Sequence, residues 1–162
     1  MNNKYKIILL TIYIFIIIFT NVMASIVDKN NNEKATFGAG CFWCIEAIFE
    51  IIKGVDNVEA GYAGGDIEHP TYEEVCTGKT GHAEVVQITY NPNIINYKEL
   101  LEVFWKSHDP TTLNRQGADI GSQYRSVIFY HSNQQKIIAE KSLKRIESLG
   151  VFSNSIVTEI TN

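Results

Sequence analysis

The sequence predicts an α+β fold, a ferredoxin-like two-layer sandwich in which helices pack on a mixed sheet. Between residues 35 and 131 the expected order is strand, helix, strand, strand, helix, strand. The two middle strands follow each other with only one helical turn between them, which argues against a doubly wound parallel sheet, the second candidate. The length of 162 residues, 45% of them hydrophobic, suits one domain with its own core.

The elements of the first half follow from apolar periodicity and from glycine. Residues 35–37 form a short strand, and a glycine-rich turn leads into a helix over 41–52, where apolar side chains recur every three or four positions. Gly54 ends this helix, and a second strand covers 55–62. Proline and threonine open a single helical turn at 70–75.

The second half shows the same alternation of strands and helices. Val86, Ile88 and Tyr90 alternate with polar residues, which predicts a strand over 84–90. A stripe of Leu, Phe and Trp predicts a helix over 97–108, and a loop rich in Asp, Thr, Gly and Gln follows. The remaining expected elements are a strand over 125–131, a helix over 134–149 and a strand over 156–160.

The first 24 residues differ in composition from the rest of the chain. Two lysines precede an apolar run over 7–19, and small residues stand just before Ser25, the pattern of a secretory signal peptide. Counted over residues 5–23, the stretch approaches the ~20 residues that span a bilayer, so an uncleaved membrane anchor is the alternative. Both predict an extracytoplasmic location, periplasmic or secreted. Residues 25–34 are a polar tether, and 35–162 form the folded domain.

Charge and cysteine content exclude several classes of protein. The formal net charge is −4, and the basic residues are scattered rather than grouped, so no nucleic-acid partner is expected. Three cysteines are too few for a scaffold built on disulfides, so a hydrophobic core must hold the fold. A monomer is expected, with membrane contact only through the N-terminal segment.

The motif Gly40-Cys41-Phe42-Trp43-Cys44 has the pattern of a redox site. A cysteine at a helix start lies among unpaired backbone N–H groups at the positive end of the helix dipole, so its pKa should fall below ~8.5. Cys44 follows at the helical spacing that lets two sulfur atoms meet. Two buried core thiols are the alternative, because free cysteine is often buried. The second cysteine and the neighbouring glycine and aromatic residues favour chemistry.

At this point the chain resembles a known family, the A-type peptide-methionine sulfoxide reductases. The resemblance starts near Ala35 and continues to the C-terminus, in order. It rests on the segments GCFWC at 40–44, AGYAGG at 60–65, PTYEEVCTG at 70–78, GHAE at 81–84, FW at 104–105, HDP at 108–110 and RQGADIGSQYRS at 115–126.

The resemblance implies a role for each site residue. Cys41 is the nucleophile, and Glu84 donates a proton, because a carboxyl group in an apolar pocket stays protonated to higher pH. Tyr72 and Tyr124 are hydroxyl donors to the sulfoxide oxygen, with Asp119 ordering the site. Phe42 and Trp43 form the pocket for the substrate methyl group, with core packing as the alternative for both.

The resemblance also implies how the enzyme is recycled. Cys41 becomes a sulfenic acid while methionine leaves, and Cys44 condenses with it to form a disulfide. Thioredoxin or another dithiol then reduces this disulfide, and no metal or other cofactor takes part. The substrates are free methionine S-sulfoxide and the oxidised residue in peptides and proteins, so the activity repairs oxidative damage.

Two further expectations concern Cys76 and the C-terminus. Cys76 is expected to be a buried structural thiol, because it ends a short helical turn. The chain stops at residue 162, within the last expected strand, where the similar proteins continue with an aromatic segment containing proline and histidine. A C-terminally shortened domain is therefore expected.

Three other functions remain open from the residues alone. CxxC at a strand-to-helix junction also suits a thioredoxin-like disulfide oxidoreductase, although that reading leaves Glu84 and the tyrosine loops unexplained. A metal-binding module would use Cys41, Cys44, Cys76 and His82, but the second half of this set lacks a recognised spacing. A membrane-tethered binding domain without catalytic activity is the third alternative, and it would give the cysteine pair no role.

Overall fold

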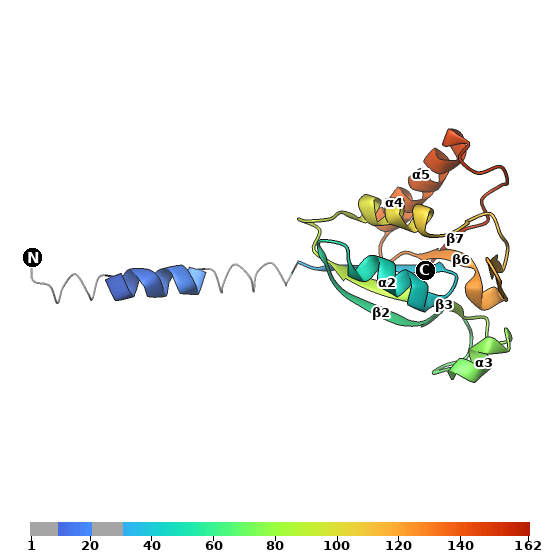
Figure 1. Cartoon of the computed structure of the whole chain (residues 1–162), viewed down its shortest axis with the longest axis horizontal. Coiled ribbons are helices and arrows are strands. Elements are labelled where there is room, and N and C mark those ends of the chain that lie inside the picture. Colours follow the sequence, from blue (N-terminus) through green and yellow to red (C-terminus); the bar gives the residue numbers. More distant parts are fainter. Residues whose placement is uncertain (1–9, 21–30) are drawn as a thin grey trace, which may run out of the picture. The chain divides into compact units, whose positions relative to one another are not determined.

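The computed structural model describes residues 10–20 and 31–162. The chain divides into two units, Met1–Asn32 and Glu33–Asn162. In the first unit, residues 10–20 are helical (Figure 1). Of the helices in the described ranges, none has the length and apolar character needed to cross a membrane. The rest of the predicted signal peptide or anchor, and most of the predicted tether, lies outside the described residues.

The second unit contains the predicted elements in the predicted order. Its elements are β1 (Glu33–Ala39), α2 (Phe42–Glu50), β2 (Val55–Ala63), α3 (Tyr72–Cys76), β3 (Ala83–Tyr90), α4 (Tyr97–Ser107), β4 (Arg115–Gln116), β5 (Asp119–Ile120), a 3-10 turn η1 (Ser122–Tyr124), β6 (Ser126–Phe129), α5 (Asn133–Leu149) and β7 (Glu159–Thr161). β1 begins two residues before the predicted strand. The predicted loop over 109–123 contains a hairpin of two very short strands, too short to leave a periodic pattern.

The main sheet has the strand order β2-β3-β1-β6-β7. β1 pairs antiparallel with both β3 and β6, and β2 pairs antiparallel with β3. β7 joins β6 in parallel, so the sheet is mixed. Strands β2, β3, β1 and β6 thus have the ferredoxin-like order, and β7 extends this sheet by one strand. The prediction of an α+β fold is confirmed, and the doubly wound parallel sheet is excluded.

Helices α2, α4 and α5 cover one face of this sheet (Figure 1). Their apolar stripes and the facing strand residues form the main core. Phe37 lies at the centre of this core, with its ring centroid 5.7 Å from that of Phe49 and 5.1 Å from that of Phe104. Both Phe37 and Phe104 are fully buried. Because apolar burial contributes ~25 cal/mol per Å², this aromatic centre is a main source of stability.

The two faces of β3 differ in what they carry. Ala83 and Val85 belong to a small apolar cluster with Val127 and Phe129. Successive side chains of a strand point to opposite faces, so Glu84 lies on the face that holds Val86, under the helices. Strand alternation therefore brings one carboxyl group into the core layer beside α2.

The helices begin at residues that satisfy their free N–H groups in different ways. α3 and α4 each start with a capping box, Thr71 with Glu74 and Asn96 with Glu99. α5 starts at Ser132, whose hydroxyl accepts from the N–H of Gln135 at 3.2 Å. α2 has no side-chain cap, and Cys41 occupies its N-cap position. The first N–H groups of α2 thus remain available to side chains from elsewhere in the fold.

Candidate active site

Cys41 lies at the junction between the central strand β1 and helix α2. Gly40 has φ +92°, a conformation that L side chains rarely adopt, and a Cβ atom there would lie 2.6 Å from Cγ of Gln116. The Cys41 carbonyl accepts the first helical hydrogen bond, from Cys44 N–H at 3.2 Å. The Cys41 side chain is partly buried. Glycine at position 40 therefore permits the turn that puts this sulfur at the helix start.

Cys44 lies one turn further along α2, and its thiol is exposed. Both cysteines are free thiols. Their side chains are hydrogen-bonded to each other, and negative charge on Cys41, followed by burial and Asp119, raises the pKa of Cys44. The two sulfur atoms are therefore close enough to interact while both are reduced.

Glu84 lies beside the start of α2 although it comes from β3. Its side chain is 2% exposed, and its Oε2 accepts a hydrogen bond from the backbone N–H of Phe42 at 3.0 Å. Burial raises the pKa of Glu84, the Phe42 hydrogen bond opposes this effect, and Asp119 adds to it. Glu84 therefore points into the fold and not outward from the strand. The fold thus holds a carboxyl group with a raised pKa against the residue that follows Cys41.

Phe42, Trp43 and Tyr72 form an aromatic group at the mouth of the site. Phe42 is buried, whereas Trp43 is 63% and Tyr72 is 47% exposed. The ring centroids of Phe42 and Trp43 are 5.4 Å apart, and the rings of Trp43 and Tyr72 stack at 6.4 Å. An exposed pair of large rings next to two thiols offers a surface for an apolar group of a ligand.

Tyr124 and Asp119 come from the segment after α4 and approach the same centre. Burial, Glu84 and Asp119 raise the pKa of Tyr124, while a hydrogen bond with the Gln123 side chain lowers it. Asp119 acts electrostatically on Cys44, Glu84 and Tyr124. The short hairpin β4–β5 and the 3-10 turn therefore bring these two residues near Glu84.

The structure corrects the expectation for Cys76. Its thiol is exposed rather than buried, since in the five-residue helix α3 the buried position belongs to Val75. A hydrogen bond with Cys76 is the main reason why the pKa of Tyr72 rises to about 12. Cys76 also acts on Tyr62 and Tyr124. This third cysteine therefore belongs to the surroundings of the site.

Tyr62 is a site neighbour to which the motifs assigned no role. It is the direct partner of Glu84 in the β2–β3 register, and its ring centroid lies 5.6 Å from that of Phe42. The sequence carried one usable signal. Strand pairing of 55–62 with 84–90, with a hairpin register, would have set the tyrosine opposite the glutamate.

The proposed metal ligand His82 is fully engaged by its own loop. Its Nδ1 accepts from Gly65 N–H at 3.2 Å, and its Nε2 is 2.8 Å from the carbonyl oxygen of Ile67. Neither nitrogen is left for a metal ion. Across residues 10–20 and 31–162, no group of His, Cys, Asp and Glu is arranged to hold a metal.

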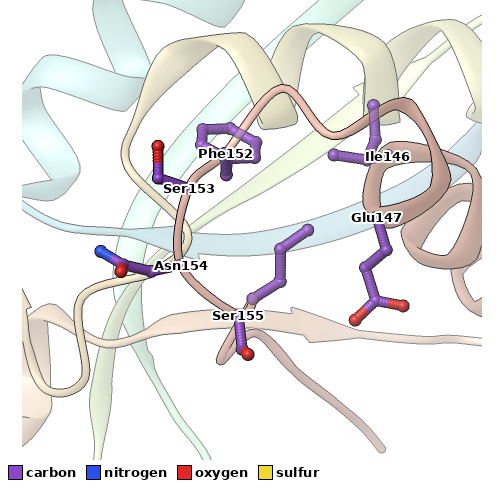
Figure 2. A pocket seen from close by; sticks show the side chains of 7 residues that line it. Ile146, Glu147, Phe152, Ser153, Asn154 and Ser155 are labelled. Atoms are coloured by element: carbon purple, nitrogen blue, oxygen red, sulfur yellow. The ribbon is translucent and has the colours of Figure 1, made fainter.

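A pocket of about 290 Å³ lies elsewhere, between the end of α5 and the segment that follows it (Figure 2). Its walls include Ile146, Glu147 and Phe152, and none of its lining residues is a predicted site residue. The cysteine pair instead opens onto the aromatic group of Phe42, Trp43 and Tyr72. The cysteine pair and this pocket are thus at different places in the unit.

The comparison with protein families gives one match over the folded unit. The family described as "Peptide methionine sulfoxide reductase" matches residues 33–162. A relative named peptide methionine sulfoxide reductase MsrA, from Methanothermobacter thermautotrophicus, is 59% identical over 128 residues, which are 79% of this chain and 76% of the relative. The MsrA of Methanosarcina acetivorans is 60% identical over 128 residues, 79% of this chain and 68% of the relative.

Solved structures give the same result. Methionine sulfoxide reductase A of Corynebacterium diphtheriae is 37% identical with a TM-score of 0.72, over 81% of this chain and 64% of that one. Mxr1 of Saccharomyces cerevisiae in its reduced form is 36% identical with a TM-score of 0.75, over 82% of this chain and 76% of that one. The chain thus spans slightly under two thirds of the Corynebacterium protein. With its fold, its cysteine motif and these identities, the chain belongs to the peptide methionine sulfoxide reductase family.

Proposed function

We propose that this chain is a thiol-dependent reductase of methionine S-sulfoxide, free and in proteins, and repairs oxidised methionine. Besides family membership, one structural observation supports this function. The backbone N–H of Phe42, adjacent to Cys41, holds the buried carboxyl group of Glu84 at 3.0 Å. A soft nucleophile and a carboxyl group with a raised pKa are thereby fixed at one helix start, where cleavage of an S–O bond needs a nucleophile and a proton donor.

In the first step the Cys41 sulfur attacks the sulfoxide sulfur. The attack forms a bond between the two sulfur atoms, and the sulfoxide oxygen takes a proton from Glu84. The oxygen then moves to the Cys41 sulfur as the substrate S–O bond breaks, and methionine leaves with the electron pair of the sulfur–sulfur bond. Cys41 is left as a sulfenic acid, so the substrate is reduced by two electrons and Cys41 is oxidised by two. Tyr72 and Tyr124 donate hydrogen bonds to the oxygen, and Phe42 and Trp43 receive the methyl group.

In the second step Cys44 condenses with the sulfenic acid. A Cys41–Cys44 disulfide forms and water leaves. The exposure of Cys44 and its existing contact with Cys41 support this role. An external dithiol protein then reduces the disulfide by thiol–disulfide exchange and becomes oxidised itself. A solved structure of the similar yeast Mxr1 is a complex with Trx2, at 27% identity and a TM-score of 0.58, which supports a thioredoxin-type reductant.

An assay with separate sulfoxide epimers tests this function. The chain is supplied with the S and R epimers of a peptide methionine sulfoxide, with dithiothreitol as reductant. We expect turnover of the S epimer, abolished in Cys41→Ser and unchanged in the surface control Lys98→Ala on α4. Activity toward insulin disulfides without any sulfoxide turnover would instead identify a disulfide oxidoreductase and refute the proposal.

We further propose that residues 1–24 export the domain, which then acts outside the cytoplasm, either released after cleavage or anchored by residues 5–23. The two lysines, the apolar run and the small residues before Ser25 support this address. Mass spectrometry of the mature N-terminus in membrane and soluble fractions tests it. An intact N-terminus confined to the cytoplasmic fraction would contradict export.

A further inference from the structure

Tyr62 is placed against Glu84 by strand pairing, although no step of the proposed reaction uses it. The two residues are direct partners in the antiparallel pair of β2 and β3. Opposed residues of such a pair project from the same face of the sheet, with Cβ atoms ~5 Å apart. Tyr62 also packs against the main core under the helices, the layer in which Glu84 is buried. The phenol ring is therefore an immediate neighbour of the carboxyl group.

Phe42 joins the two residues from the helix side. Its ring centroid lies 5.6 Å from that of Tyr62, and its backbone N–H donates to Glu84 Oε2 at 3.0 Å. Next to burial, the charge of Glu84 is the main influence that raises the pKa of Tyr62. The carboxyl group is thus bounded by α2 on one side and by the Tyr62 ring on the adjacent strand.

The other side of Tyr62 faces open space. Tyr62 lines a pocket of about 670 Å³ whose other walls come from the loop 65–70 and His82. The loop contributes Asp66, Glu68 and His69, polar walls of the kind that hold water. Glu84 does not line this pocket and is 2% exposed. A tyrosine ring therefore lies at the boundary between a wet pocket and a dry carboxyl group.

We propose that Tyr62 is a positioning residue whose ring shuts the 65–70 pocket off from Glu84 and so keeps that carboxyl group dry and protonated for the reaction. The inference deepens the proposed sulfoxide reductase function and rests on it for its purpose. The ring, rather than the hydroxyl group, performs this task, because it is the ring that occupies the volume water would otherwise enter. Keeping a carboxyl group from water raises the pH up to which it can give a proton.

The other groups that face Glu84 stay in place when Tyr62 is changed. They come from three other elements, namely Tyr72 on α3, Asp119 on β5 and Tyr124 on η1. Tyrosine is uncharged near neutral pH, so replacing Tyr62 removes no charge from this group. A change in Glu84 titration therefore reports hydration of the carboxyl group and not a lost ion pair.

Infrared spectroscopy of the whole chain can follow the Glu84 carboxyl group directly. The C=O band of the protonated acid is recorded against pH and assigned by its absence in Glu84→Gln. We expect Tyr62→Ala to move its midpoint to lower pH by about one unit, a tenfold change in the protonated-to-ionised ratio. Tyr62→Phe retains the ring and should titrate like the original chain. Tyr62→Leu, which fills part of the volume, should fall between them and serves if Tyr62→Ala fails to fold.

Tyr130→Ala is the matched control, because Tyr130 is also half-buried but its ring contacts Lys136 on α5. It should leave the band unchanged. An unchanged midpoint in Tyr62→Ala, or an equal shift in Tyr62→Phe, would overturn the inference even if the epimer assay succeeds. Failure of that assay alone would refute the proposed function, while the infrared titration would still decide the role of Tyr62.

Discussion

Burial and one backbone hydrogen bond set the acidity and the orientation of Glu84. Strand alternation buries it, and burial alone disfavours the ionised form. The Phe42 N–H partly offsets this penalty and fixes the direction of the carboxyl group toward the start of α2. Because the N–H belongs to the residue after the nucleophile, this one hydrogen bond holds the acid beside the Cys41 backbone.

Replacing Glu84 by glutamine should remove the proton donor and keep the shape. We expect the single-turnover rate of S-sulfoxide reduction to fall roughly 10²–10⁴-fold. Because the pKa of Glu84 is raised, its protonated form survives to higher pH, and the rate it supports is lost as pH rises through that value. Rapid quenching between pH 5 and 9 measures this alkaline loss. Glu59→Gln on the exposed side of β2 is the control. A persisting alkaline limb in Glu84→Gln would assign the donor elsewhere.

Replacing Cys44 by serine should separate reduction from recycling. The first turnover should remain, since Cys41 still accepts the oxygen, but thioredoxin-type reductants should no longer restore the enzyme. Product released per chain with excess substrate measures this. Cys76→Ser is the matched control, because a serine hydroxyl can still hydrogen-bond Tyr72 and recycling should continue. Full recycling of Cys44→Ser would rule out Cys44 as the resolving residue.

At the scale of elements, α3 is the weakest part of the site. It has five residues, and a capping box of Thr71 and Glu74 holds its first turn. The Thr71 hydroxyl accepts from Glu74 N–H at 3.3 Å, and the Glu74 carboxylate accepts from Thr71 N–H at 2.8 Å. Such a short helix has no stability of its own. The position of Tyr72, its first residue, depends on this cap.

Thr71→Ala should therefore impair the reaction more than the fold. Losing an N-cap costs about 1 kcal/mol, and here most of that loss falls on the single turn that carries Tyr72. We expect a raised KM for peptide sulfoxide, with a small change in the urea midpoint. Asn96→Ala removes the same kind of capping box from α4, away from the cysteines, so it should lower stability similarly but leave KM unchanged. Equal effects of both variants on KM would contradict this account.

The elements also show what sequence reasoning could and could not reach. Strands and helices with clear periodicity, such as those around Val86 and Leu100, were predictable because their pattern follows from burying one face. The exposure of Cys76 could not be predicted, because a one-turn helix is too short for a periodic pattern that would indicate its buried side. Tyr62 was missed because its partner, Glu84, is set by strand register rather than by sequence spacing.

At the scale of the whole molecule, a partly buried network of polar side chains links segments distant in the sequence. His108, after α4, has its Nδ1 2.8 Å from the Phe104 carbonyl oxygen and its Nε2 2.7 Å from Ser126 Oγ. Ser126 Oγ lies in turn 2.7 Å from Thr158 Oγ1, near the last strand. A neutral imidazole satisfies both contacts, with Nδ1–H donating to the carbonyl group and Nε2 accepting from the serine hydroxyl.

The His108 hydrogen bonds should make the stability of the fold sensitive to acid. Burial lowers the pKa of His108 from 6.5 to about 4, while the unfolded chain keeps the ordinary value. As pH falls from about 6.5 to about 4, the unfolded state takes up a proton that the folded state refuses, which costs about 3 kcal/mol of stability by pH 4. Urea unfolding at several pH values measures the loss. His108→Gln should be less stable at pH 7 but show a smaller acid dependence, whereas His69→Gln, at an exposed position, should behave like the original chain.

The central claim is that Cys41 takes the oxygen of methionine S-sulfoxide, and trapping the sulfenic acid tests it most directly. Cys44→Ser is mixed with one equivalent of the S epimer and dimedone, without reductant, and digested for mass spectrometry. We expect one dimedone adduct per methionine formed, located on the peptide that contains Cys41. An adduct on Cys76, or methionine formed without any adduct on Cys41, would contradict it.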